Sequence, residues 1–264
     1  MPDDKQRLSA QFDLLFKKPP RFNNQLSVAS VKEKHTDNVD IAYELISNLD
    51  NSTLAIQGPP GTGKTYTGSH VIAKLVADGK RIGITAVGHA VIANLLEEVA
   101  EASNCAVTIA HRGDKTQATA PGCKLLASDK EKKKIREALD KGWVVGATAW
   151  TWAATPMIQE LDYLFVDEAG QMALATVLTA SRAAKNVVLL GDPQQLEQPQ
   201  RAAHPEGSEI AALAHLIGDR QTITEDQGLF LDTTYRMHPR ICDFTSEQYY
   251  DCLLYTSPSP RDRG

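Results

Sequence analysis

One eight-residue loop constrains the fold of this chain more than any other feature of its sequence. The loop reads GPPGTGKT at 58–65, and it lies between an apolar run, STLAIQ, and a segment with helical spacing at 67–77. A glycine-rich loop that joins a strand to a helix turns its backbone N–H groups toward phosphate oxygens. A chance glycine-rich turn is the alternative, but the flanking strand and helix favour a phosphate-binding loop.

The residue types in this loop suit a nucleoside triphosphate with a divalent cation. Lys64 supplies a positive charge to the β and γ phosphates, and the hydroxyl of Thr65 can bind Mg²⁺. We expect the loop to contact the nucleotide along its whole length, through Gly58, Pro59, Pro60, Gly61, Thr62, Gly63, Lys64 and Thr65.

Apolar runs of strand length alternate with helical patterns along most of the chain. Expected strands lie at 52–57, 81–87, 143–150, 163–169 and 186–192, and expected helices at 39–49, 67–77 and 89–102. Strands that alternate with helices form parallel sheets, and the helices cover both faces of the sheet. The sequence thus predicts an α/β fold in which loops at the carboxyl ends of the strands surround the phosphates.

Two adjacent carboxylates follow the apolar run YLFV. Asp167, at the expected tip of this strand, can bind Mg²⁺ directly or through water, and Glu168 can accept a proton from an attacking water. Asp-Glu pairs are common on protein surfaces, but this pair follows a buried strand about a hundred residues after the phosphate loop. We therefore predict a metal ligand at Asp167 and a catalytic base at Glu168.

Two later segments carry weaker signals. Gln195 lies in a polar turn after the strand NVVLLGD, where its amide can both donate to and accept from a γ-phosphate. Arg236 lies in TTYRMHPRI, and a guanidinium can neutralise the charge that develops on a transferred phosphoryl group. Taken alone, Arg236 could equally form a surface salt bridge.

Together and in this order, these elements resemble the motifs of superfamily 1 helicases. The branch is the one that contains the nonsense-mediated decay helicase and the helicase half of the nuclease-helicase of Okazaki-fragment processing. GPPGTGKT resembles motif I, TAVGHAVIANLLEEV motif Ia, GATAW motif Ic, VDEAGQ motif II, GDPQQL motif III and YRMHP motif IV. A closer similarity, through FVDEAGQMALATVL, LLGDPQQLEQP and HPEGSEI, is to bacterial proteins in which a RecB-like nuclease precedes such a P-loop helicase.

The resemblance implies an ATP-dependent helicase or translocase that uses ATP and Mg²⁺ and moves on single-stranded DNA or RNA, with DNA favoured over RNA as the partner. It assigns catalytic roles to Lys64, Asp167, Glu168, Gln195 and Arg236. It also implies that Thr85, Thr148 and Trp150 line the path of the strand. A polar residue that caps a strand and an aromatic side chain in the core are the alternatives for these three.

The resemblance also implies a division of the chain. Residues 1–35 would connect to an upstream nuclease domain, 36–226 would form a first RecA-like domain, and 227–251 would begin a second one. We interpret 252–264 as read-through of a sequencing adapter, because CLLYTSPSPRD is the translation of a transposase adapter; a natural Ser/Pro-rich tail is the alternative. Motifs V and VI of the family are missing, so we expect this chain alone to bind nucleotide weakly and to hydrolyse almost none.

Two other functions stay open on the sequence. One is another P-loop ATPase, such as an AAA+ remodeller, although YRMHP and GDPQQL speak against it. The other is a nucleotide-gated module that binds nucleic acid without turnover. The adenine-reading Gln of the family has no counterpart in HTDNVDIAYELISN at 35–48, which leaves the base selectivity open.

Composition and charge limit where the protein can be located and how it can contact nucleic acid. No apolar run approaches the ~20 residues that a membrane helix needs, and the acidic start MPDDKQRLSA lacks the features of a secretion signal, so we expect a cytoplasmic protein. A net charge of −5 argues against a broad basic face that coats DNA, but it allows a local groove for a single strand. The locally basic stretch at 112–141 is an alternative nucleic-acid contact, with a solvated helix face as its default interpretation.

Overall fold

A computed structural model describes residues 9–113, 120–126, 132–195 and 210–257. It contains an eight-stranded sheet with the strand order β4-β3-β5-β2-β6-β7-β1-β8, in which every described pairing is parallel. The strands are β1 (Thr53–Gln57), β2 (Ile82–Thr85), β3 (Ile109–Arg112), β4 (Lys124–Leu126), β5 (Val144–Gly146), β6 (Leu161–Val166), β7 (Ala184–Gly191) and β8 (Gly228–Phe230). The predicted α/β fold with a parallel sheet is confirmed.

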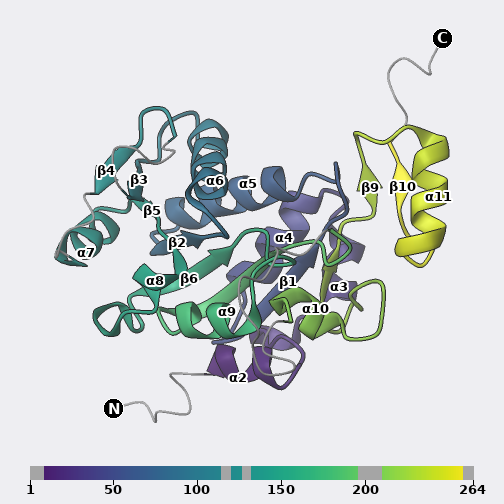
Figure 1. The fold of residues 1–264 in the computed structure, drawn as a ribbon, viewed down its shortest axis with the longest axis horizontal. Coiled ribbons are helices and arrows are strands. Elements are labelled where there is room, and N and C mark those ends of the chain that lie inside the picture. Colours follow the sequence, from purple (N-terminus) through teal and green to yellow (C-terminus); the bar gives the residue numbers. More distant parts are fainter. Residues whose placement is uncertain (1–8, 114–119, 127–131, 196–209, 258–264) are drawn as a thin grey trace.

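Helices cover both faces of this sheet because its central strands are apolar on both sides (Figure 1). Along β7, Val187 and Leu189 pack into one core cluster, whereas Val188 and Leu190 pack into the other. The first cluster is covered by α2 (Ser9–Leu15), α7 (Lys132–Asp140), α8 (Ala149–Trp152), α9 (Leu174–Ser181) and α10 (Ala212–Ile217). The second is covered by α3 (Val28–Lys34), α4 (Asn38–Ser47), α5 (Lys64–Ala77) and α6 (His89–Ala102).

The N-terminal segment differs from the predicted connector, because part of it folds against the sheet. Leu14 of α2 is fully buried, and the buried Asp13 pairs with Arg21 at 2.6 Å and accepts a hydrogen bond from the Ser52 hydroxyl at 2.7 Å. Val31 of α3 is buried in the second cluster. Helices α2 and α3 therefore pack into the two core clusters of the main sheet. A short 3₁₀ turn lies at Asn23–Gln25, and another at Thr155–Met157.

The main sheet continues past the predicted domain boundary after residue 226, and that boundary stays a prediction. Strand β8 pairs with β1, with Gly228 opposite Ala55 and Phe230 opposite Gln57, so it is the edge strand of the main sheet. A Cβ on Gly228 would lie 2.3 Å from the Ala55 carbonyl oxygen, which explains the glycine at this close approach. The main sheet thus includes residues up to 230.

Residues 233–257 form a small unit beside the phosphate loop, which we call the C-terminal unit. It consists of β9 (Thr233–Thr234), α11 (Pro239–Tyr249) and β10 (Tyr255–Thr256), and β10 pairs with β9 in parallel. In Figure 1 the C-terminal unit (yellow) stands apart from the main sheet. Strand β10 lies inside the segment that we interpret as adapter-derived, and that interpretation stays a prediction. Among the described residues, none of the helices has the length and apolar character to cross a membrane.

Candidate active site

The phosphate loop begins at the end of β1, which lies between β7 and the edge strand β8. The Gly58 N–H donates to the Gly191 carbonyl at 3.0 Å, which ties the loop to the end of β7. Gly61 and Gly63 have φ values of 80° and 82°, a conformation that favours glycine. Helix α5 then starts at Lys64, three residues earlier than predicted, because Gly63 is its left-handed N-cap. The positive end of a 14-residue helix therefore points at the loop.

Lys64 is held beneath the loop that it follows. Its Nζ donates to the Gly58 carbonyl, and a Cβ on Gly58 would lie 2.5 Å from the Lys64 side chain. Burial lowers the pKa of the Lys64 ammonium, and the carboxylates of Asp192, Glu168 and Asp167 raise it. A positive charge with three carboxylates around it is thus fixed at the base of the phosphate site.

Asp167 and Glu168 follow β6 directly. The Asp167 N–H donates to the Thr85 carbonyl at 2.9 Å, and the Glu168 N–H donates to Asp167 Oδ1 at 2.9 Å. Glu168 has a φ of 53°, so the chain turns sharply there and separates the two carboxylates. Burial and the neighbouring Glu168 raise the pKa of Asp167 to about 6. Oε2 of Glu168 is buried without a hydrogen-bond partner among the described residues, as suits a group that meets a water or substrate.

The donor set at this point fits Mg²⁺. The Thr65 hydroxyl and the Asp167 carboxylate offer hard oxygen ligands, and a buried carboxylate gains from a nearby cation. No group of three His, Cys, Asp or Glu side chains in the described part of the chain could hold a metal ion. Mg²⁺ usually binds through one or two carboxylates together with substrate phosphates, so this sparse set is the expected one.

A cavity of about 760 Å³ is lined by four of the five predicted catalytic residues, and Asp167 is not among its lining residues. Its wall includes Lys64, Thr65, Glu168, Gln195 and Arg236. Arg236 comes from the C-terminal unit, and its Cβ lies against Gly61, where an added Cβ would approach it to 2.5 Å. Residues that are 172 positions apart in the chain, Lys64 and Arg236, therefore meet at one site.

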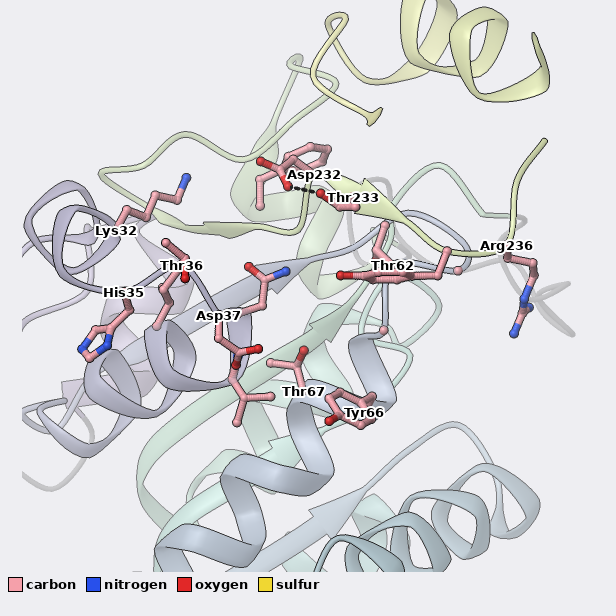
Figure 2. A pocket seen from close by; sticks show the side chains of 17 residues that line it. Lys32, His35, Thr36, Asp37, Thr62, Tyr66, Thr67, Asp232, Thr233 and Arg236 are labelled. Atoms are coloured by element: carbon pink, nitrogen blue, oxygen red, sulfur yellow. Dashed lines mark hydrogen bonds between the residues drawn. The ribbon is translucent and has the colours of Figure 1, made fainter. Parts of the chain in front are cut away.

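A second cavity, of about 960 Å³, adjoins the first on the other side of the phosphate loop. Figure 2 shows Lys32, His35 and Asp37 from the N-terminal helices on one side of it, and Thr62 and Arg236 on the other. Sequence reasoning missed this wall. The available signal was Asp37, a helix N-cap whose Oδ1 accepts from the Val39 N–H at 2.8 Å.

The three residues that were predicted to contact nucleic acid differ in how far their side chains are exposed. Thr85 is fully buried at the end of β2, so its side chain cannot reach a strand, and the predicted contact is corrected. Thr148 is half-buried at the start of α8, and Trp150 in that helix is 87% exposed. The core position belongs instead to Trp152, whose indole N–H donates to the Ile84 carbonyl at 3.0 Å.

Three comparisons with known proteins bear on this site. Residues 41–204 match a family described as an AAA domain. The chain is 28% identical over 147 residues to the DNA replication ATP-dependent helicase/nuclease DNA2 of Saccharomyces cerevisiae, which covers 53% of this chain and 10% of that protein. It is 23% identical over 256 residues to the DNA polymerase alpha-associated DNA helicase A of Schizosaccharomyces pombe, which covers 79% of this chain and 38% of that protein.

Among solved structures, a complex of the Arterivirus nonstructural protein 10 (helicase) with DNA overlaps with a TM-score of 0.49 at 15% identity, covering 79% of this chain and 42% of that one. The resemblance to helicases that the motifs predicted is confirmed by the named relatives. The chain spans well under half the length of each of these relatives.

Proposed function

The chain belongs to the AAA domain family, and on that premise we propose that it is the ATP-binding part of an ATP-dependent helicase or translocase. One observation carries the proposal: the phosphate loop, Glu168 and an arginine from the C-terminal unit line one cavity, and the Glu168 N–H donates to the adjacent Asp167 carboxylate. Such a site suits hydrolysis of a phosphoanhydride bond. The named helicase relatives support the link to nucleic acid.

In this proposal each side chain has one task. The backbone of 58–63 and the Lys64 ammonium bind the β and γ phosphates, and Glu168 accepts a proton from the water that attacks the γ-phosphorus. The products are ADP and inorganic phosphate. Mg²⁺, held by Thr65 and Asp167, would neutralise phosphate charge when bound.

Gln195 and Arg236 act at the γ-phosphate end in the same proposal. The Gln195 amide contacts the γ-phosphate and reports its presence to the turn after β7, because Gln195 lines the same cavity as Lys64. Arg236 neutralises charge in the transition state, and it belongs to a unit that can move relative to the sheet.

The proposed partner is single-stranded nucleic acid, DNA in preference to RNA. Trp150 supports it, because an exposed indole beside a groove of about 240 Å³ can stack on a base. We extend the proposal to an upstream nuclease domain in the same protein and to a cytoplasmic location. The first is supported by a relative whose name combines helicase and nuclease.

Two substitutions test the nucleotide site. In a full-length protein that contains both RecA-like domains, Glu168→Gln should keep binding of a fluorescent ATP analogue in Mg²⁺ and remove single-strand-stimulated phosphate release, because an amide cannot accept the water proton. Lys64→Ala should weaken binding itself by about ten- to a hundredfold, because it removes a charged contact to the phosphates. Unchanged release in Glu168→Gln would refute the base assignment. Binding without any release in the unsubstituted full-length protein would favour a nucleotide-gated binding module.

The strand contact is tested separately. Trp150→Ala should lower the affinity for a labelled single-stranded oligonucleotide by about fivefold or more, whereas Trp150→Phe should retain most of it, because a ring remains to stack. The affinity should fall only modestly with salt, since few phosphates are neutralised. A steep salt dependence with no effect of Trp150→Ala would point to the basic segment at 112–141.

A further inference from the structure

A tyrosine in the C-terminal unit reaches into the phosphate site through a buried hydrogen bond. The Tyr250 hydroxyl donates to Oδ2 of Asp192 at 2.7 Å, and the two residues are 3% and 1% exposed. Tyr250 closes α11, whereas Asp192 directly follows β7. This bond joins the C-terminal unit to the central strands of the main sheet, next to the phosphate loop.

Asp192 interacts with three other groups: the turn that carries Gln195, Lys64 and Tyr250. Its Oδ1 accepts from the Gln194 N–H at 3.2 Å, and its carbonyl accepts from the Gln195 N–H at 3.4 Å, so it shapes the turn that carries Gln195. Its carboxylate also raises the pKa of the Lys64 ammonium. Asp192 therefore joins the Gln195 turn to Tyr250.

Further hydrogen bonds hold Tyr250 in this place. Gln221 donates through its amide to the Gln248 carbonyl at 3.0 Å and accepts from the Asp251 N–H at 3.2 Å. The Thr222 hydroxyl donates to Asp251 at 2.7 Å. The end of α11 is thus fixed against the main domain at the residue that carries the Tyr250 hydroxyl.

We propose that Tyr250 is a positioning residue that links the placement of the C-terminal unit to the strength of triphosphate binding. The inference rests on the proposed function. The Asp192 side chain and carbonyl hold the turn that carries Gln195, the residue that contacts the γ-phosphate in the proposed function. While Tyr250 donates to Asp192, that carboxylate is fixed in place, and the turn presents Gln195 to the γ-phosphate.

The reverse follows from linkage. When α11 moves away, Asp192 loses a donor and the turn that carries Gln195 is held less firmly, so the triphosphate is bound less tightly. By reciprocity, binding of the triphosphate favours the arrangement in which Tyr250 and Asp192 are bonded. The hydrogen bond thereby couples the γ-phosphate to the position of the C-terminal unit.

The test uses the 264-residue chain and removes only one hydroxyl, with Tyr250→Phe. Its matched control is Tyr249→Phe, at the preceding residue, whose side chain is 49% exposed. The affinities for fluorescent ADP and for a fluorescent, non-hydrolysable ATP analogue are measured with Mg²⁺. Tyr250→Phe should weaken the triphosphate by about tenfold and the diphosphate by about threefold or less, as expected for one hydrogen bond to a charged group. Tyr249→Phe should leave both affinities unchanged.

A purely structural role would weaken both nucleotides alike, so an unchanged ratio of the two affinities would overturn the inference. A double-mutant cycle adds a second readout, because in an Asp192→Asn background Tyr250→Phe should have little further effect on the ratio. Equal effects of Tyr250→Phe in both backgrounds would also overturn it. If the unsubstituted chain binds neither nucleotide, the proposed function itself fails, and the inference fails with it.

Discussion

The sheet end that forms the phosphate site and the C-terminal unit above it are built in opposite ways. The phosphate loop rises from β1, whose residues are all buried, and it lies between strands that pair over several residues on each side. The C-terminal unit contacts that loop through two hydrogen bonds, from the Tyr235 N–H to the Gly61 carbonyl at 2.9 Å and from the Thr234 hydroxyl to the Pro60 carbonyl at 3.0 Å. The first region is embedded in the main sheet, whereas the C-terminal unit is held by hydrogen bonds and by three side chains, Cys242, Tyr250 and Leu254, that are buried in the first core cluster.

This contrast separates two tasks. Ground-state contacts to the phosphates belong to the sheet end, where burial fixes Lys64, Asp167 and Glu168. Groups that respond to the nucleotide belong to the C-terminal unit, whose apolar side chains Ile241 and Phe244 are 59% and 62% exposed. Few buried contacts mean a low free energy of local opening, as expected of an element that moves in a catalytic cycle.

We expect the buried Asp167 carboxylate at the end of the sheet to lower the stability of the folded chain, and a bound metal ion to offset that loss. Asp167 has a pKa raised from 3.8 to about 6, so its ionised form is disfavoured in the folded state. Its contribution to stability therefore falls as the pH rises from about 4 to 6 and stays low above that range. In EDTA at pH 8, Asp167→Asn should raise the free energy of unfolding by up to about 3 kcal/mol, and at pH 4 by much less.

Urea denaturation at the two pH values measures this effect as a difference from the unsubstituted chain, which cancels other titrating groups. With Mg²⁺ and ADP present the sign should reverse, because Asp167→Asn loses a metal ligand. An Asp167→Asn chain that is less stable than the parent in EDTA at pH 8 would contradict the assigned cost.

The junction between the two regions is tested by a pair of glycines. Gly61 and Gly63 both have positive φ, so an alanine at either position costs about 1–2 kcal/mol in backbone strain. A Cβ at 61 would also lie 2.5 Å from Arg236 Cβ and 2.8 Å from the Thr234 hydroxyl, whereas at 63 the nearest atom is 3.8 Å away. Gly61→Ala should therefore cost about 1–3 kcal/mol more than Gly63→Ala in urea denaturation. Equal losses would mean that the C-terminal unit does not press on the loop.

The same contrast explains what the sequence could predict of the fold. Strands β1, β2, β6 and β7 contain short apolar stretches, such as LAI in β1 and VVLL in β7, so their burial could be read from the sequence. Helix α6 begins at His89 as predicted. Strand β3 was missed because it ends in His111 and Arg112, yet His111 is fully buried and lies 2.9 Å from the His89 ring. Tertiary contacts decide such a strand, and three-residue β8 is too short to show a pattern.

The residues of the candidate site also divide into those that the sequence predicted and those that it did not. The phosphate-loop residues and Glu168, Gln195 and Arg236 were predicted as one site, and they lie around one cavity. The wall at Lys32, His35 and Asp37 was not predicted, because nothing local marks a polar segment that folding brings beside the loop. Thr85 was wrong for a related reason: its polar side chain ends a strand in the interior, and only the packing of its neighbours reveals that.

Local opening should differ between the two regions without any change to the nucleotide site. In native-state hydrogen exchange the amides of α11 should exchange faster than those of β7, whose residues are mostly buried in the main sheet. Thr234→Val removes the hydrogen bond to the Pro60 carbonyl and should speed exchange in α11 by about fivefold, for a loss of about 1 kcal/mol. Exchange in β7 should not change. Equal acceleration of both elements would show that they open as one unit.

The smallest expected effect concerns recognition of the nucleobase of the bound nucleotide. The nucleobase would lie in the larger cavity, between the N-terminal helices and the C-terminal unit. His35 Nε2 is paired with Glu44 at 2.5 Å, and Asp37 caps α4, so both polar side chains are engaged. The Tyr235 ring, 69% exposed, offers a stacking surface, and stacking accepts any base.

Fluorescent ATP and GTP analogues should therefore bind within about threefold of each other, and Tyr235→Ala should weaken both alike by roughly tenfold. Tyr235→Phe, which keeps the ring, is the control and should retain both affinities. A preference for ATP above about tenfold in the unsubstituted chain would mean that Thr36 or Asn38, the remaining polar side chains of this wall, reads the base edge. Asn38→Ala would then lower that preference, and the junction of the two regions would set nucleotide selectivity as well as coupling.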